Sequence, residues 1–455
     1  MTMTRPNDPF TSDIARFHEV KGAKDEPFAE LTRYHEVRGV REMVESFRVR
    51  EVPSYYVKPV NERRFTPPSA AVLSMEQQIP CIDLEALSGQ ELLSAIANAC
   101  RDWGFFQVLN HGLPSQLVQN MAKQSSEFFA QPLEEKMKCS TPARVSGPVH
   151  FGGGGNRDWR DVLKLNCAPA SIVAKEYWPQ RPAGFRDTME EYSSQQQALA
   201  IRLLKLISES LGLESNYLVA ACGEPKVVMA INHYPPCPDP SLTMGIKAHS
   251  DPNTITMLLQ DDVGGLQVFK EDRWIDVRPL PNALVINVGD QLQCRVEKIR
   301  AITGGNRGSS SSRQATSRAE LGRVEQWSAV RSSNSSSSRA CTRDAMGCKC
   351  DGDRVEILSN GKYSSCLHRV VNNNRQARTS IATFFSPAHA CIIGPAPGLV
   401  DEVNPAIYPN IVYADYIKAF YTQALGPNNK NGGYLAGIEL HRRYNCYTSS
   451  SSISS

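Results

Sequence analysis

The stretch GIKAHSDPNTITMLLQDD places two side chains that can bind a metal, His249 and Asp251, on either side of Ser250. If this stretch is regular strand, residues two apart point to the same face of the sheet, with Ser250 on the other face. The chain has nine histidines. By chance alone, roughly 0.5 His-x-Asp triplets are expected in such a chain. The triplet alone therefore does not decide between a metal site and an ordinary strand.

A third candidate ligand and a candidate anion clamp lie further along the chain. His368, in LHRVV, is on another predicted strand, and ARTS places Arg378 and Ser380 shortly after it. Two imidazoles and one carboxylate on one face of iron leave the opposite positions open, as in non-haem Fe(II) oxygenases. A guanidinium and a hydroxyl that share a face are suited to bind a carboxylate. Together these residues predict an iron site that takes an anionic, chelating cosubstrate.

The elements that must position these residues are short strands. Beyond Lys226, apolar runs such as VVMAINHY, TITMLLQ, ALVINVG and TSIATFF are separated by Gly, Pro and Asp, a pattern typical of a sandwich or jelly roll. Upstream, Ser88 and Glu91 have capping-box spacing and predict a helix over 88–102. GFFQVLNHG predicts a buried strand, and apolar residues over 199–211, followed by Gly212, predict a second long helix.

The organisation predicted from these patterns has four parts. They are a charged N-terminal extension over 1–60, a helix-rich N-terminal domain over 61–220, a jelly-roll domain over 221–390, and a C-terminal helix with a Ser-rich tail over 391–455. Charged residues and a near-repeat, RFHEVKGAK and RYHEVRGVR, mark the extension.

A Ser- and Arg-rich segment over 294–356 interrupts the predicted jelly roll. Its composition cannot bury enough apolar surface to offset the cost of ordering, so we expect it to be exposed and poorly ordered. The motif GD occurs on both sides of it, as GDQLQ from Gly289 and GDRVE from Gly352. Deleting either 289–351 or 294–356 leaves one continuous strand, which suggests retained non-coding sequence or an error in the gene model.

Composition excludes several classes of function. Hydrophobic residues make up 41% of the chain, charged residues 21%, and the net charge is only +3. That charge is too small to predict a nucleic-acid partner, and no window approaches the ~20 apolar residues of a membrane span. The thirteen cysteines have no framework spacing. We expect a cytoplasmic monomer that acts on a small molecule and binds neither nucleic acid nor membrane.

The motifs NHYPPCPDP, HSDPNTITMLLQDDVGGLQV, ALVINVGD, SNGKY and HRVV, with IPCIDL and WGFFQVLNHG upstream, resemble the plant-type 2-oxoglutarate- and Fe(II)-dependent dioxygenases of the isopenicillin-N-synthase-like superfamily. The resemblance covers about residues 78–390 apart from the Ser/Arg-rich segment. It implies a distorted double-stranded β-helix (jelly roll) with flanking helices. It also implies iron on His249, Asp251 and His368. The cosubstrate contacts that it implies are Arg378 and Ser380 for the far carboxylate of 2-oxoglutarate, with Tyr234 and Asn232 as further contacts.

The activity implied by this resemblance is oxidation of a small organic metabolite of the flavonoid, hormone or specialised-metabolite class. Fe(II), 2-oxoglutarate and O₂ would be needed, with ascorbate in support, and hydroxylation or desaturation would release succinate and CO₂. Two alternatives stay open: a non-catalytic relic inactivated by the insertion, and a jelly roll that only binds a small molecule. The substrate itself is not encoded in these motifs.

Three further features of the sequence have expected roles, two of them outside the active site. His111 is expected to hold a turn, and DWRD, from Asp158 to Asp161, is expected to tie a loop to the domain face. Neither is expected in the active site. Phe384 and Phe385 alternate on a strand, so one is expected to line the substrate cavity and the other to pack elsewhere.

Overall fold

The computed structural model describes residues 39–46, 48–63, 78–139, 157–291, 357–360, 362–406 and 408–425. The near-repeat apart from its last three residues (39–41), the segment 294–356 and the Ser-rich tail lie outside these described residues. The expectations that concern these three segments therefore stay predictions.

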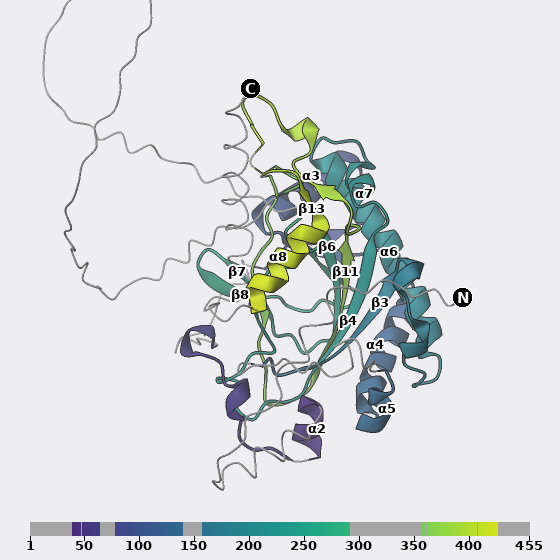
Figure 1. The fold of residues 1–455 in the computed structure, drawn as a ribbon, viewed down its shortest axis with the longest axis vertical. Coiled ribbons are helices and arrows are strands. Elements are labelled where there is room, and N and C mark those ends of the chain that lie inside the picture. The colour runs from purple at the N-terminus through teal and green to yellow at the C-terminus, as the bar shows by residue number, and fades with distance from the viewer. Residues whose placement is uncertain are drawn as a thin grey trace, which may run out of the picture. The chain divides into compact units, whose positions relative to one another are not determined.

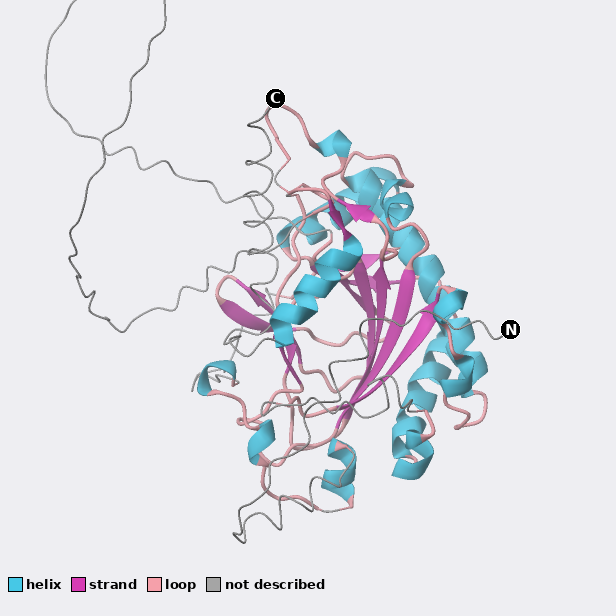
Figure 2. Ribbon diagram, in the orientation of Figure 1, coloured by secondary structure: helices cyan, strands magenta, loops and turns pink. Residues whose placement is uncertain are grey.

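The core is a seven-stranded sheet in which one pair of neighbouring strands is parallel and the other pairs are antiparallel. Three of its strands come from the predicted N-terminal region and complete the same sheet as the strands of the predicted jelly roll. The long strands of this sheet run side by side in Figures 1 and 2. In spatial order its members are β1 (Cys81–Asp83), β2 (Phe105–Leu109), β9 (Leu284–Val288), β6 (Ile255–Gln260), β11 (Arg378–Ser386), β4 (Lys226–Tyr234) and β3 (Asp161–Ala168).

A smaller antiparallel sheet carries two of the candidate metal ligands. Its order is β5 (Ile246–His249), β10 (His368–Val370), β7 (Leu266–Lys270) and β8 (Arg273–Asp276). A two-stranded ribbon, β12 (Ile392–Ile393) and β13 (Ile411–Val412), comes after it in the chain. The two larger sheets line one cavity from both sides, so the structure confirms a mainly β core of jelly-roll type, although the described strands do not close into a barrel.

Helices cover the face of the large sheet that is turned away from the cavity (Figure 1). Alternate residues of β4 and β11, among them Met229, Ile231 and Phe385, are buried in one apolar cluster with residues of two helices, α4 (Ser115–Ala130) and α6 (Phe185–Ser210). The other face of the same strands is free to line the cavity, because successive side chains on a strand point to opposite sides.

The helices agree with the sequence patterns in position more closely than in detail. The predicted helix over 88–102 is α3, and Ser88 occupies its N-cap position, but no side-chain capping hydrogen bond forms there. The predicted second helix is the last part of α6, and Gly212 follows its end with a φ of 78°. The α-helices are α2 (Val40–Glu45), α3 (Gly89–Asp102), α4 (Ser115–Ala130), α5 (Leu133–Met137), α6 (Phe185–Ser210), α7 (Tyr217–Ala221) and α8 (Tyr413–Leu425). The short 3₁₀ turns are Ser54–Tyr56, Val60–Glu62, Ala170–Ile172, Lys175–Tyr177 and Pro397–Leu399.

The described N-terminal segment packs directly on the core. Val40, Met43 and Tyr56 are buried with Trp159 in one apolar cluster. The carboxylate of Asp161, at the start of β3, accepts hydrogen bonds from the backbone N–H groups of Val40 and Arg41 at 2.7 and 3.0 Å. The described residues of this segment thereby support β3, an edge strand of the large sheet. Within the described part of the chain, no helix combines the length and apolar character needed to cross a bilayer.

Candidate active site

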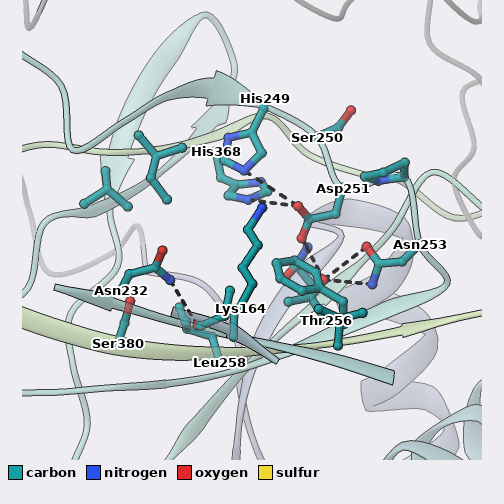
Figure 3. A pocket seen from close by; sticks show the side chains of 18 of the residues that line it. Lys164, Asn232, His249, Ser250, Asp251, Asn253, Thr256, Leu258, His368 and Ser380 are labelled. Atoms are coloured by element: carbon teal, nitrogen blue, oxygen red, sulfur yellow. Dashed lines mark hydrogen bonds and ion pairs between the residues drawn. The ribbon is translucent and has the colours of Figure 1, made fainter. Parts of the chain in front are cut away.

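His249, Asp251 and His368 converge at one end of the paired strands β5 and β10 of the small sheet (Figure 3). His249 ends β5 and His368 begins β10, and the two residues are direct partners in the register, with ring centroids 4.1 Å apart. Asp251 Oδ1 lies 3.6 Å from His249 Nε2 and 3.7 Å from His368 Nε2. One ligand atom from each side chain lies within 4.8 Å of the others, so a single cation can be held by all three.

Asp251 reaches this point from a loop rather than from a strand. Strand β5 ends at His249, and β6 does not begin until Ile255. The carboxylate is fixed instead by two donors: Thr256 Oγ1 and Asn287 Nδ2 both hydrogen bond to its Oδ2, at 2.7 and 2.8 Å. The other oxygen, Oδ1, is left to face the histidines.

Backbone carbonyls fix the orientation of both imidazoles. His249 Nδ1 is 2.9 Å from the carbonyl oxygen of Lys247, and His368 Nδ1 is 3.3 Å from that of Cys366. A carbonyl only accepts hydrogen bonds, so Nδ1 carries the proton in each ring and the Nε2 lone pair points toward Asp251. This is the outer support that metal-binding histidines ordinarily have.

The charge state of the cluster suits a divalent transition metal. Burial, followed by the neighbouring His368, lowers the pKa of His249 to about 4, although Asp251 opposes the shift. Burial alone would raise the pKa of Asp251, but the two histidines and the two hydrogen bonds to its Oδ2 hold that pKa below its ordinary value. An ionised carboxylate beside a neutral imidazole is the donor chemistry that a metal requires.

A second polar group lies on the floor of the cavity, on the large sheet. Arg378 is 2% exposed; its Nη1 donates to Ser380 Oγ at 3.1 Å and its Nη2 to Gln260 Oε1 at 3.0 Å. The guanidinium carbon lies 5.1 Å from the centroid of the Tyr234 ring. The register explains this grouping, because Tyr234 is opposite Arg378 and Gln260 is opposite Ser380.

Three buried polar atoms of this group have no partner among the described residues: Tyr234 Oη, Arg378 Nε and Gln260 Nε2. All three can donate a hydrogen bond, and leaving such groups buried without an acceptor is costly. A ligand carboxylate supplies acceptors for donors of this kind. The residues present therefore fit an anionic cosubstrate that binds in the same cavity as the three candidate metal ligands.

Asn232 lies in the same cavity and makes two hydrogen bonds within the protein. Its Oδ1 accepts from Arg160 Nη1 at 2.7 Å, and its Nδ2 donates to the carbonyl of Ala230 at 3.2 Å. The side chain therefore orients Arg160, and the direct cosubstrate contact expected from the sequence stays a prediction.

The cavity has a volume of about 400 Å³ and is lined by residues of both sheets and of α8. Phe384 lines it, whereas Phe385 is buried in the core beneath the sheet, as alternation predicts. His111 accepts the N–H of Leu113 within a turn, also as expected. The cavity is large enough for a small organic molecule.

The prediction that DWRD stays outside the site was wrong, because Asp158 and Arg160 both line the cavity. The tying role that we expected is present as well. Asp158 Oδ1 is 2.9 Å from the buried ammonium of Lys58 and accepts the backbone N–H of Lys247 at 3.2 Å. The motif thus joins the N-terminal segment to the strand that ends in His249.

Sequence patterns missed Lys164, which lines the cavity, and Gln260, which contacts Arg378 beside it. Gln260 shares a face with Thr256 and Leu258 by simple alternation, so its strand assignment could have placed it. Lys164 interrupts the apolar run DVLKL, and an isolated cation within a buried strand was the signal available for it.

The fold and the site define a class of protein. Two facing sheets with two imidazoles and one carboxylate at their mouth are the arrangement of non-haem Fe(II) oxygenases. Two family models match the chain: non-haem dioxygenase in morphine synthesis N-terminal over residues 79–182, and 2OG-Fe(II) oxygenase superfamily over 225–301 and 348–387. The chain belongs to the 2OG-Fe(II) oxygenase superfamily and is a dioxygenase that uses Fe(II) and 2-oxoglutarate.

Relatives and solved structures agree with this assignment. The chain is 36% identical to Protein DMR6-LIKE OXYGENASE 1 of Arabidopsis thaliana, over 82% of this chain and 90% of that protein. It is 35% identical to Flavanone 3-dioxygenase 2 of Oryza sativa subsp. japonica, over 82% and 91%. The crystal structure of JOX2 in complex with 2OG, Fe and JA superposes with a TM-score of 0.65 at 29% identity, covering 89% of this chain and 97% of that one.

Proposed function

We propose that this enzyme hydroxylates or desaturates a small organic metabolite and releases succinate and CO₂ from 2-oxoglutarate. The observation that carries the proposal is the pairing, within one cavity, of the cluster His249, Asp251 and His368 with a buried anion site. In that site Tyr234 Oη and Arg378 Nε have no partner among the described residues. Relatives named for flavanone oxidation and a neighbour solved with JA support a substrate of the flavonoid, hormone or specialised-metabolite class.

The roles of the residues follow from their geometry. His249 Nε2, His368 Nε2 and Asp251 Oδ1 hold the iron, and Thr256 and Asn287 keep the carboxylate aimed at it. When bound, iron with 2-oxoglutarate and O₂ supplies the oxidising chemistry.

The far carboxylate of 2-oxoglutarate binds the group of donors on the sheet floor. The Arg378 guanidinium supplies charge and the Ser380 hydroxyl a further donor, while Tyr234 Oη lies beside them with its hydrogen-bonding capacity unused. Gly245 makes room for the Tyr234 ring, since a Cβ at that position would lie 2.8 Å from its Cδ1. Asn232 acts through Arg160, which it orients at the cavity wall.

Turnover is tested by incubating the purified protein with Fe(II), 2-oxoglutarate and candidate metabolites. Succinate formation is followed together with the mass of the metabolite. We expect succinate to form in step with a product that has gained one oxygen atom or lost two hydrogens. A protein that binds iron but forms no succinate with any metabolite beyond a metal-free control would contradict the proposal.

Arg378→Lys is expected to weaken the apparent affinity for 2-oxoglutarate by about 10- to 100-fold, while metal binding is retained. Lysine keeps the charge but cannot donate in a planar fork to Ser380 and Gln260 at once. The matched control is Arg375→Lys, an exposed arginine in the turn before the same strand. A titration of 2-oxoglutarate that gives the same half-saturation for Arg378→Lys and the control would move the anion site elsewhere.

A further inference from the structure

Lys164 presents an ammonium group inside the cavity, at a place that the roles assigned above do not use. It lies in the middle of β3, opposite Ala230 in the register. Its side chain rises from the sheet and its amine points toward the two histidines (Figure 3). Within the described residues this amine has no hydrogen bond and no ion pair, unlike Arg160, which contacts Asn232 and Asp158.

The surroundings of Lys164 on the sheet are apolar and small. Ala230, Ala382 and Leu258 continue its row across β4, β11 and β6, and all line the cavity. Phe384 lines the cavity two residues further along β11. A charged donor above an apolar floor is a setting for a ligand with an apolar body and one anionic group.

The anion site for 2-oxoglutarate is at the other end of the same strands. Arg378 precedes Ala382 by four residues on β11, about 13 Å along a strand, and Ala382 shares the row of Lys164 through Ala230. The side chains of Arg378 and Lys164 therefore arise from different parts of the cavity floor.

The charges around the cavity favour an anionic ligand in addition to the cosubstrate. Its lining contains five cationic side chains, Arg160, Lys164, Lys226, Lys247 and Arg378, but only two carboxylates, Asp158 and Asp251. Asp158 is paired with Lys58, and Asp251 belongs to the metal cluster.

Holding Lys164 in this position has a cost that a bound anion offsets. Burial, and then the charge of Arg160, lower the pKa of Lys164 to about 8, and Asp251 only partly opposes them. The ammonium is thus disfavoured in the protein without ligand. An apolar side chain would fill this bay without that penalty.

We propose that Lys164 determines substrate specificity by binding a carboxylate of the substrate, so that this enzyme prefers organic acids with an apolar body over their neutral analogues. The inference rests on the proposed function and names the class of substrate for the same site. The ammonium of Lys164 pairs with the substrate carboxylate, while the apolar body lies over Ala382 and Phe384 beside the metal.

The test measures binding of matched acids and esters. The probes are benzoic, cinnamic and indole-3-acetic acids and their methyl esters, titrated into protein loaded with Mn(II) and 2-oxoglutarate under argon. The proteins are the parent, Lys164→Met, Lys164→Arg, and the control Lys123→Met, whose lysine is 73% exposed on α4. Methionine fits an apolar bay, and affinity for 2-oxoglutarate is measured for each variant.

We expect the parent and the control to bind at least one acid more tightly than its ester by about 10- to 100-fold. Lys164→Met should remove that preference, Lys164→Arg should keep part of it, and affinity for 2-oxoglutarate should stay within about threefold. A parent without any preference for acids, or a preference that survives in Lys164→Met, overturns the proposal. Weaker binding of 2-oxoglutarate to Lys164→Met, with the acids unaffected, also overturns it.

Failure of the proposed function would be visible separately. In that case the parent would not bind Mn(II) and 2-oxoglutarate or would form no succinate, whatever its preference between acids and esters.

Discussion

Asp251→Ala is expected to abolish metal-dependent consumption of 2-oxoglutarate. The substitution removes the only carboxylate of the cluster and leaves two histidines facing a site without an anionic ligand. Loss of an outer partner of a ligand typically costs 10- to 100-fold in metal affinity or activity, and loss of the ligand itself should cost more than about 100-fold. The consequence should be absence of bound iron as well as absence of turnover.

The same substitution also affects stability, which has to be separated from its effect on the metal. Thr256 Oγ1 and Asn287 Nδ2 would lose their shared acceptor, and an unsatisfied buried group costs about 1–3 kcal/mol. His249→Ala avoids this problem. The His249 side chain is 31% exposed, and its removal frees only the carbonyl of Lys247.

Both variants should be compared with Asp262→Ala, which removes an exposed carboxylate in the turn after β6. Iron content after dialysis, the melting temperature and 2-oxoglutarate consumption are measured on each protein. We expect His249→Ala to melt near the parent while it loses iron and turnover. If either cluster variant consumed 2-oxoglutarate at the rate of the Asp262→Ala control, the metal site would have been assigned to the wrong residues.

The chemistry of the site could be predicted from the sequence because it depends on residue type. His249, Asp251 and His368 are few in kind and characteristic in combination, and the strand-rich pattern after Lys226 indicated where they would be held. Their arrangement could not be predicted in the same way. His249 and His368 meet because β5 and β10 are paired in the small sheet, and such long-range pairing leaves no local trace. We reasoned that Asp251 shares a strand face with His249, but the loop after β5 holds it instead.

Residues without a distinctive type were missed for a related reason. Gln260 and Lys164 matter because the face of the sheet on which they lie happens to border the cavity, and that depends on how the two sheets pack. Arg160 was left out of the site because DWRD was expected only to tie a loop to the domain face. In each case the local pattern was compatible with several environments, and only tertiary packing selected one of them.

The two described ends that flank 292–356 lie next to each other. The backbone N–H of Leu358 donates to the carbonyl of Gln291 at 2.8 Å, and the carbonyl of Leu358 accepts from Ala396. If 294–356 were removed, Leu358 would follow Gln291 by four positions, and this hydrogen bond would close a single α-turn. The superfamily model also matches 225–301 and 348–387 and leaves out the residues between them.

The structure describes the first of the two GD motifs, and the second lies outside the described residues. The copy at Gly289 is in the core, where a Cβ on Gly289 would lie 2.0 Å from the carbonyl oxygen of Asn253. The next residue, Asp290, accepts hydrogen bonds from the hydroxyls of Ser250, Ser365 and Tyr416. The first copy thereby braces the loop that carries Asp251, the approach to His368, and helix α8.

Deleting 294–356 is therefore expected to stabilise the enzyme and to raise its soluble yield with turnover intact. Each doubling of loop length costs about 0.6 kcal/mol, so shortening this connection by about five doublings should raise the free energy of unfolding by about 3 kcal/mol. Deleting 289–351 is the matched control, because it removes the same number of residues and also leaves one GD motif. It would place Arg354 where Gln291 is now, at a position that is 0% exposed and whose side-chain amide donates to the carbonyl of Pro252.

An arginine at that position would be buried, and the partner of the Gln291 side chain there is the carbonyl of Pro252 rather than a carboxylate, so the buried charge should cost several kcal/mol. The shortened protein lacking 294–356 should consequently need more urea to unfold than the one lacking 289–351, and it should give more soluble protein than the full chain. Urea titrations, soluble yield and succinate formation measured on the three proteins decide the matter. If deleting 294–356 lowered stability or removed turnover, or if both deletions behaved alike, the first GD motif would not be the one that completes the catalytic core.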